Sequence, residues 1–356
     1  MKLLYITYID FGDFRSGSSV RPQMMYRAFK ELGCEIKLLQ TQQNKREERR
    51  RAVEEVNRWL DGNRPDLCYV ESPSGPIFNS CDRKLLKRLH VMGVPTGYFL
   101  RDAAYKFDEV FVEGKKSLKQ RVIAWMSERD IRFLAKNIDL IYFPTESMAR
   151  YFSFPRVETL LPGCAGRLSD RRGNQNQNRC IYVGGVSKRY GTDTLLKAFE
   201  LLNGDGAGYP LTLVCRESGL SYIGRDYLAK PWLHVVHASG KEALKKLYDV
   251  ADLALYPIQK NVYNDFAFSV KLMEYLEFGL PVVTVDSEEA AKFTRRHVTG
   301  LVSKDDPEDF AEKIREILKD QKTYEGYVQN VYDALEGNLW LDRAKKVMDD
   351  LGGKRG

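Results

Sequence analysis

Residues 270–285 read VKLMEYLEFGLPVVTV and join an amphipathic segment directly to a short apolar one. The apolar residues of the first part recur at helical spacing, which predicts a helix over Val270–Phe278 that ends at Gly279. The β-branched run Val282–Val285 predicts a buried strand. A helix that leads at once into an entirely apolar strand is typical of a parallel sheet covered by helices on both faces.

The same alternation extends outward from this stretch through the second half of the chain. Short apolar runs predict strands, and amphipathic runs between them predict helices. The expected strands are Cys180–Val183, Leu211–Cys215, Leu233–His237 and Leu253–Tyr256; the expected helices are Thr194–Leu202, Lys241–Val250 and Pro307–Leu318. This half is therefore predicted to form one doubly wound domain.

The first half of the chain repeats the pattern. Its expected strands are Lys2–Ile9, Glu35–Leu39, Leu67–Val70, Thr96–Leu100 and Leu140–Phe143; its expected helices are Gln23–Leu32, a charged helix through Arg58, and Lys84–Leu89. We predict an α/β protein with two doubly wound, Rossmann-like domains that face each other across a cleft, where the carboxyl ends of parallel strands bind ligands. A periplasmic-type binding protein is the alternative, and the absence of a signal peptide counts against it.

The boundary between the two halves is predicted from composition. Residues Arg167–Asn178 are rich in Arg, Gly, Asn and Gln, lack apolar periodicity and are interpreted as an interdomain linker. The expected domains are residues 1–164 and 165–338. The final segment, Leu339–Leu351, is amphipathic, follows a loose stretch, and is expected to pack back on the first domain.

Composition and charge narrow the class of protein. The chain has 356 residues with 43% hydrophobic residues, which is typical of a folded soluble protein. Its net charge of +7 comes entirely from residues 1–165, which suggests an anionic partner for that half, although a basic solvated face is the alternative. The six cysteines lack zinc-ligand spacing, and no run approaches the length of a membrane span. We expect a cytoplasmic protein that at most lies on a membrane.

Two loops between a predicted strand and a predicted helix carry small residues. The first, Phe11–Pro22, includes Gly17 and places Pro22 at the expected first helical position. The second, Ile181–Asp193, contains Gly184-Gly185 followed by Lys188 and Arg189, with Thr192 or Asp193 as a helix cap. Glycines allow a ligand to approach backbone N–H groups at a helix start, which suits a phosphate; ordinary turns are the alternative.

The helix Val270–Phe278 carries Lys271 and Glu274 three positions apart, on one face. Such a pair is usually a solvated ion pair. Because the remaining residues of this helix are largely apolar, a charged pair on it requires a partner. We therefore expect both side chains to reach a ligand at the start of the helix.

Three motifs together resemble the donor domain of GT-B glycosyltransferases, and more narrowly the retaining, family 4-like group (glycosyl transferases group 1) that uses nucleotide sugars. They are Val270–Tyr275, Gly279–Val283, and Gly300–Val302 followed by acidic Asp305-Asp306 and a helix. The likeness covers nearly the whole chain and includes the Gly17 loop, the Tyr182–Phe199 unit, the Asp252–Pro257 strand and a C-terminal segment with Trp340.

The resemblance implies roles for individual residues. Glu274 would hold the ribose hydroxyls of the donor, and the loop before its helix, with Ser269, would hold the diphosphate and sugar. Lys271 would offset the charge on the leaving group. The other expected donor-binding residues are Gly17, Gly185, Lys188 and Arg189; the expected catalytic residues are Lys271, Arg101, Asp102 and Asp265.

The sequence departs from the family pattern at four places. Phe266 stands where the two-glutamate pattern has its first Glu, beside Asp265. The phosphate-binding Arg and Lys of the family fall on Gly185 and Tyr190. The remaining two departures are Arg101-Asp102 in place of His-Asp, and Ser269-Val270-Lys271 in place of Pro-x-Lys.

The resemblance also implies how the reaction runs. The leaving phosphate itself acts as the base, so the protein supplies positioning and electrostatics. No Asp-x-Asp stands at a strand end. Neither a divalent metal nor a cofactor is therefore expected, and the nucleoside-diphosphate sugar is the donor substrate.

The first domain is expected to hold the acceptor, a glycan that related enzymes often use in lipid-linked form. The basic runs Lys45–Arg51 and Lys115–Met126 hold many of the excess cations, and the second mixes them with apolar residues as an interfacial helix would. We therefore predict a hexose-transferring enzyme of surface polysaccharide assembly, peripheral on an anionic membrane, with no nucleic-acid partner. A catalytically silent GT-B subunit and a GT-B sugar-nucleotide epimerase are the alternatives.

Overall fold

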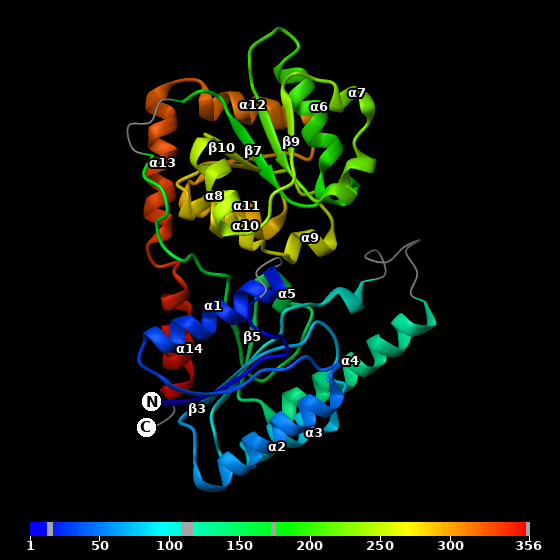
Figure 1. Ribbon diagram of the computed structural model, residues 1–356, viewed down its shortest axis with the longest axis vertical. Helices are drawn as coiled ribbons and strands as arrows, with labels where there is room; N and C mark the ends of the chain where they lie inside the picture. Colours follow the sequence, from blue (N-terminus) through cyan, green and yellow to red (C-terminus); the bar gives the residue numbers. More distant parts are fainter. Residues whose placement is uncertain (13–16, 108–116, 172–175, 354–356) are drawn as a thin grey trace. The chain divides into compact units, whose positions relative to one another are not determined.

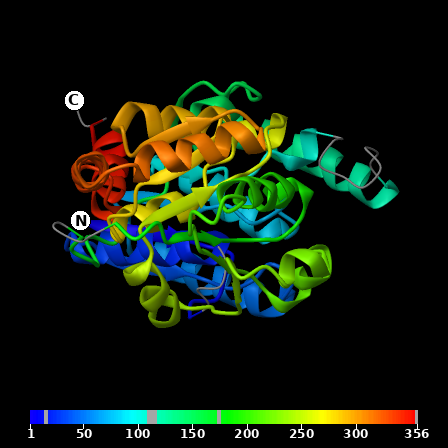
Figure 2. The same ribbon diagram turned by 90° about the horizontal axis from the view of Figure 1, so that it is seen from above.

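The computed structural model describes residues 1–12, 17–107, 117–171 and 176–353. The chain divides into two units: Met1–Gly163 together with Trp340–Gly356, and Cys164–Leu339. Each unit contains a six-stranded parallel sheet between helices (Figures 1 and 2). The chain has the GT-B fold, as predicted.

The first unit has the sheet order β2-β1-β3-β4-β5-β6, with every neighbouring pair parallel. Apolar side chains of α1 and α14 pack on one face of this sheet, and α2, α3 and α4 lie on the other (Figure 1). Its strands are β1 (Lys2–Ile6), β2 (Glu35–Leu39), β3 (Leu67–Glu71), β4 (Thr96–Phe99), β5 (Leu140–Phe143) and β6 (Val157–Thr159). Its helices are α1 (Gly17–Glu31), α2 (Arg46–Gly62), α3 (Ser80–Val91), η1 (Ala104–Lys106), α4 (Leu118–Asn137), α5 (Glu146–Ala149) and α14 (Trp340–Gly352).

The second unit has the sheet order β12-β11-β10-β7-β8-β9, again all parallel. One face is covered by α6, α12 and α13, and the other by α8, α10 and α11. Its strands are β7 (Cys180–Val183), β8 (Leu211–Val214), β9 (Leu233–Val236), β10 (Leu253–Tyr256), β11 (Val282–Val285) and β12 (Gly300–Ser303). Its helices are η4 (Lys188–Tyr190), α6 (Thr192–Leu202), η5 (Glu217–Tyr222), α7 (Arg225–Leu228), α8 (Lys241–Val250), α9 (Val262–Phe266), α10 (Val270–Glu277), α11 (Glu288–His297), α12 (Pro307–Leu318) and α13 (Gln321–Leu335).

The segment predicted as an interdomain linker, Arg167–Asn178, is instead part of the second unit, and that prediction is wrong for the residues described. Arg171 is fully buried, and its guanidinium donates hydrogen bonds to the backbone carbonyls of Tyr248, Ala251 and Phe278. These carbonyls lie at the ends of α8 and α10, where helices leave acceptors without intrahelical donors. This segment of polar composition therefore contains a buried arginine that holds it to the second unit.

Two predictions about helices also require correction. Pro22 lies inside α1 rather than at its start, because the buried Arg21 before it is held by Glu71 and by the carbonyl of Leu160. The stretch before the last helix is not loose, because α13 occupies Gln321–Leu335.

The basic run Lys45–Arg51 contains both a buried and an exposed arginine. Arg49 is fully buried and forms a salt bridge with Asp82 on α3, with Nη2 to Oδ1 at 2.7 Å. It also donates to the carbonyl of Thr7 at 2.8 Å. Arg50 is exposed and pairs with Glu47 in the same helix. One cation of the run is thus a core residue.

Candidate functional site

The strand order of the second unit defines one topological switch point. β7 and β10 are neighbours at the centre of the sheet, and the chain proceeds from them to opposite edges. In doubly wound sheets, ligands bind outside the carboxyl ends of the strands at such a switch point. The residues that directly follow these strands are Gly184-Gly185 after β7 and Pro257 after β10.

Small residues in the loop after β7 are required by packing. Tyr182 donates a hydrogen bond from its hydroxyl to the carbonyl of Gly185 at 2.6 Å, and a Cβ at position 185 would overlap the ring of Tyr190. Gly191 has a φ of 70° and lies against the carbonyl of Pro257, so that a Cβ there would collide with backbone. The loops after β7 and β10 therefore touch each other.

The cations of this loop lie on η4. Lys188 and Arg189 are both exposed. The guanidinium of Arg189 lies over the ring of Tyr263 on α9, 4.5 Å from its centroid, and its backbone carbonyl accepts a hydrogen bond from Asn264 at 3.5 Å. The expected cap by Thr192 or Asp193 is not present: Gly191 is the N-cap of α6 and makes no side-chain cap bond. The structure thus brings η4 and α9 together.

Ser269 is the N-cap of α10, and its hydroxyl accepts a hydrogen bond from the backbone N–H of Lys271 at 3.2 Å. The helix is anchored by buried apolar residues and by Tyr275, whose hydroxyl donates to the carbonyl of Leu255 on β10 at 3.4 Å. Ser269 also contacts Tyr256, the last residue of β10, so the N-terminus of α10 stands next to the carboxyl end of a central strand. The positive end of the helix dipole favours an anion there.

Lys271 and Glu274 form the predicted pair on one helix face. Lys271 Nζ lies 2.5 Å from Glu274 Oε2, with side chains 30% and 25% exposed. The same carboxylate oxygen accepts a hydrogen bond from the hydroxyl of Tyr248 on α8 at 3.1 Å. Oε1 accepts no hydrogen bond from any residue that the structure describes. The pair is thus half-buried and held by a third side chain, unlike a freely solvated ion pair.

The position of the missing family glutamate is part of the core. Phe266 is buried and packs edge-on against Tyr263, with ring centroids 5.0 Å apart. Its neighbour Asp265 accepts a hydrogen bond through Oδ1 from the backbone N–H of Glu288, at the first residue of α11, at 3.2 Å. Asp265 therefore has a structural partner, and its expected catalytic role stays a prediction.

Two further predicted catalytic residues, Arg101 and Asp102, belong to the first unit, directly after β4. Arg101 is largely buried, 3.9 Å from the fully buried Glu71, and burial lowers the pKa of its guanidinium. Asp102 accepts a hydrogen bond from the backbone N–H of Ala104 at 2.8 Å. Their catalytic roles stay predictions.

Gly17, the remaining predicted donor-binding residue, is the first residue of α1 in the first unit. Residues 13–16 of its loop lie outside the described residues. The loop before them folds back on the helix, because the backbone N–H of Gly12 donates to Oε1 of Gln23 at 2.7 Å.

Sequence reasoning did not find Tyr248 or Glu277. Burial and the charge of Glu274 raise the pKa of Tyr248 well above its usual value, so that its hydroxyl remains a donor. Glu277 is buried one turn after Glu274, and burial raises its pKa to about 7. It accepts a hydrogen bond from the backbone N–H of Ala165 at 2.5 Å. Both residues lie in helices that were predicted. Their residue types alone did not indicate that Tyr248 contacts Glu274 or that Glu277 contacts Ala165.

Comparisons with known proteins assign the second unit. Residues 169–334 match the family model of glycosyl transferases group 1. The predicted resemblance to glycosyl transferases group 1 is confirmed for this region, which contains β7, β10 and α10. No curated protein matches the chain.

Solved structures extend the likeness to the whole chain. HepE from Anabaena, in complex with UDP, has a TM-score of 0.67 at 13% identity, over 99% of this chain and 100% of that one. WaaG, a glycosyltransferase involved in lipopolysaccharide biosynthesis, has a TM-score of 0.63 at 16% identity over 99% and 100%. A glycosyltransferase from Rickettsia africae ESF-5 has a TM-score of 0.67 at 10% identity over 100% and 99%. At these low identities, the structural likeness shows the fold alone.

Within the described ranges, no helix combines the length and the hydropathy needed to cross a lipid bilayer.

Proposed function

We propose that the chain is a retaining glycosyltransferase that moves a hexose from a nucleoside-diphosphate sugar to a glycan acceptor in surface polysaccharide or glycoconjugate assembly. The observation that carries the proposal is the half-buried pair of Lys271 and Glu274 at the switch point of a group 1 glycosyltransferase domain. The complex of HepE with UDP supports a nucleotide donor.

Each side chain at the switch point has a role in this proposal. Glu274 accepts the ribose hydroxyls through Oε1, because Oε2 is engaged by Tyr248 and Lys271. The N-terminus of α10, capped by Ser269, faces the diphosphate. Lys271 offsets the negative charge that grows on the leaving phosphate.

The donor phosphate itself serves as the base, and protein cations in place of a metal offset the charge of the diphosphate. The cations available to the diphosphate are Lys271 on α10 and Lys188 and Arg189 on η4. A preorganised cation stabilises charge that develops in the transition state without the reorganisation that solvent requires.

Nucleotide binding tests the proposal. Thermal-shift screening against UDP, GDP and ADP and their sugars, followed by calorimetric titration, should find one nucleoside diphosphate that binds. Glu274→Ala should weaken that binding by about 1.5–3 kcal/mol, the value of hydrogen bonds to a charged group. Glu316→Ala is the matched control, because Glu316 pairs with Lys313 at the same spacing on α12. Equal affinity of the folded Glu274 variant and the wild type would contradict the site.

We further propose that α4 binds an anionic membrane surface, which would bring a lipid-linked acceptor to the first unit. Leu118, Val122 and Trp125 are 79%, 50% and 60% exposed and lie on one helix face. Lys119 and Arg121 beside them are exposed cations, whereas Lys115 and Lys116 lie outside the described residues. Exposed apolar and cationic side chains on one helix are typical of interfacial binding.

Co-sedimentation with vesicles tests this surface. Wild-type protein should bind vesicles that contain phosphatidylglycerol at low salt, and changing Lys115, Lys116 and Lys119 to Glu should abolish binding, because each cation near the surface contributes about 1 kcal/mol. Donor hydrolysis by the variant should be unchanged. Wild-type protein that ignores these vesicles would favour a water-soluble acceptor.

One observation favours the alternative of a catalytically silent subunit. Phe266 is a core residue where the family has a glutamate, and Asp265 is engaged with α11. A silent subunit should show neither tight nucleotide binding nor donor hydrolysis, so that the same titration separates the two functions.

A further inference from the structure

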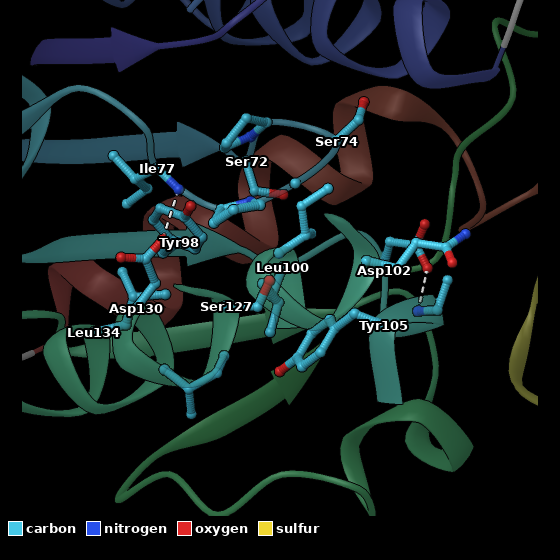
Figure 3. A pocket seen from close by; sticks show the side chains of 17 residues that line it. Ser72, Ser74, Ile77, Tyr98, Leu100, Asp102, Tyr105, Ser127, Asp130 and Leu134 are labelled. Carbon is cyan, nitrogen blue, oxygen red and sulfur yellow. Dashed lines mark hydrogen bonds between the residues drawn. The ribbon is translucent and has the colours of Figure 1, made fainter. Parts of the chain in front are cut away.

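A cavity of about 200 Å³ lies in the first unit, and Asp102, one of the predicted catalytic residues, is part of its lining (Figure 3). Its walls come from the segments after β3 and β4, from η1, and from α4. On α4 the lining residues recur at helical spacing and share one face: Gln120, Ile123, Ser127, Asp130, Ile131 and Leu134. This face is distinct from the one with the exposed residues Leu118, Val122 and Trp125.

The wall of the cavity is mostly hydrocarbon. Two prolines and several aliphatic side chains contribute to it, among them Pro73, Pro76, Ile77, Leu100, Ile123 and Leu134. The rings of Tyr98 and Tyr105 add aromatic surface (Figure 3). Such a wall stabilises an apolar ligand by removing its surface from water.

Among the described residues, eight polar side chains line the cavity, and the hydroxyl of Tyr105 is buried without a hydrogen-bond partner. Four of them accept a hydrogen bond from a main-chain N–H: Ser72 from Arg101 at 3.2 Å, Asp102 from Ala104 at 2.8 Å, Gln120 from Ser117 at 2.6 Å, and Asp130 from Ile77 at 2.6 Å. Figure 3 shows the bonds of Asp102 and Asp130. A hexose in the cavity would bury hydroxyl groups that each need a partner. The one hydroxyl of Tyr105 could pair with only part of a hexose, so the mostly hydrocarbon wall favours an alkyl group over a sugar.

The volume of the cavity limits the size of the ligand that fits it. An apolar cavity of roughly 150 Å³ admits benzene, so this one has room for a ring or for an alkyl segment of about six carbons. Longer chains would have to leave the remaining carbons outside.

We propose that this cavity binds a hydrocarbon segment of the acceptor, which is therefore amphipathic. That the ligand is the glycosyl acceptor rests on the proposed function. The affinity of the cavity for alkyl groups does not depend on it. The sugar to be glycosylated stays outside the cavity, and the alkyl segment fixes its position.

A homologous series of n-alcohols tests the cavity directly. Displacement of the fluorescent probe 1-aminoanthracene from the wild-type chain should give affinities that rise about fourfold per carbon, the gain for each buried methylene. The rise should level off at about six carbons. No displacement, or a rise without a plateau through decanol, would overturn the proposal.

Variants locate the binding. Ser127→Phe should fill the cavity and abolish probe and alcohol binding, because Ser127 is buried in the lining. Arg132→Phe adds the same ring to an exposed position of α4 and should bind as the wild type does. Ile123→Ala enlarges the cavity and should move the plateau to longer alcohols, which keeps the test decisive if Ser127→Phe does not fold. Wild-type binding in Ser127→Phe would contradict the assignment.

An acceptor assay separates this proposal from the proposed function. With a panel of octyl and methyl glycosides of the same sugars, the octyl form should have the lower KM, and Ser127→Phe should lose that preference while Arg132→Phe keeps it. Alcohol binding without any transfer would leave the cavity assigned and contradict the transferase. Transfer with equal KM for both forms would contradict the cavity's role.

Discussion

The hydroxyl of Tyr248 donates a hydrogen bond to Oε2 of Glu274 at 3.1 Å, across 26 residues of sequence. Lys271 Nζ reaches the same oxygen at 2.5 Å. Tyr248 is itself fixed by ring contacts with Tyr275 and Phe278, at centroid distances of 5.9 and 4.7 Å. Two donors on one oxygen orient the carboxylate and leave Oε1 without a hydrogen bond from any described residue.

Removal of this hydroxyl should weaken nucleotide binding. Tyr248→Phe keeps the ring packing and deletes one hydrogen bond, so the Kd for the bound nucleoside diphosphate should rise about 2- to 10-fold, from a loss of roughly 0.5–1.5 kcal/mol. Because Glu274 is proposed to read the ribose, the preference for the ribonucleotide over its 2′,3′-dideoxy analogue should fall as well. Both quantities are measured by calorimetric titration.

Tyr227→Phe is the matched control, because Tyr227 also pairs with a glutamate, Glu200, at 3.3 Å on the surface of the same unit. It should change neither quantity. A Tyr248→Phe variant with weaker binding but unchanged preference would show that Tyr248 acts through stability alone.

The cation of the pair should matter for turnover. Lys271→Ala should lower kcat strongly with little change in Tm, because the charge is needed as the leaving phosphate forms. Lys313→Ala removes a lysine with the same i,i+3 glutamate partner on α12 and should leave kcat unchanged. Near-normal kcat in the Lys271 variant would mean that the pair of Lys271 and Glu274 has only a structural role.

Metal independence is tested in the same assay. Activity of the wild type should survive EDTA, because Lys271, Lys188 and Arg189 are proposed to offset the charge of the diphosphate. A strict requirement for Mn²⁺ would contradict this part of the proposal.

The sequence was sufficient for the fold class, because apolar runs of four or five residues between amphipathic segments occur only in a few architectures. It did not determine the strand order, since β1 pairs with both β2 and β3 through contacts that no local pattern encodes. The switch point between β7 and β10 could be located only from the structure.

Only those parts of the candidate site that depend on local spacing were predicted from the sequence. Lys271 and Glu274 share a helix, so that their spacing alone places them together. Tyr248 reaches Glu274 from another helix, and Arg171 is buried in a stretch with the composition of a linker. Arg49 did leave a signal: it lies on the face of α2 that also carries Val53, the first buried valine one turn later.

Glu277 should make stability depend on pH. Burial raises the pKa of its carboxyl from 4.5 to about 7, so the folded chain binds the proton more tightly than the unfolded chain does. Its contribution is therefore fully present below pH 4.5 and is lost as the pH rises to about 7, a loss of at most about 3 kcal/mol.

Glu277→Gln keeps an acceptor for the N–H of Ala165 and removes the titration. The difference in Tm between variant and wild type should grow in favour of the variant from pH 4.5 to 7 and then stay constant. Glu312→Gln, at an exposed position of α12, should show no such trend. A constant difference across this range for Glu277→Gln would mean that the carboxyl ionises normally in the folded chain.

The buried salt bridge of the first unit allows a comparison of two neighbouring arginines. Arg49→Met should leave the carboxylate of Asp82, 2% exposed, without its partner and cost about 3–5 kcal/mol of unfolding free energy. Arg50→Met removes a cation that is 59% exposed and pairs with Glu47, and should cost less than about 1 kcal/mol. Urea denaturation followed by tyrosine fluorescence measures both. The double variant Arg49→Met, Asp82→Leu should recover much of the loss, because it removes the uncompensated charge; equal costs for Arg49→Met and Arg50→Met would contradict the buried pair.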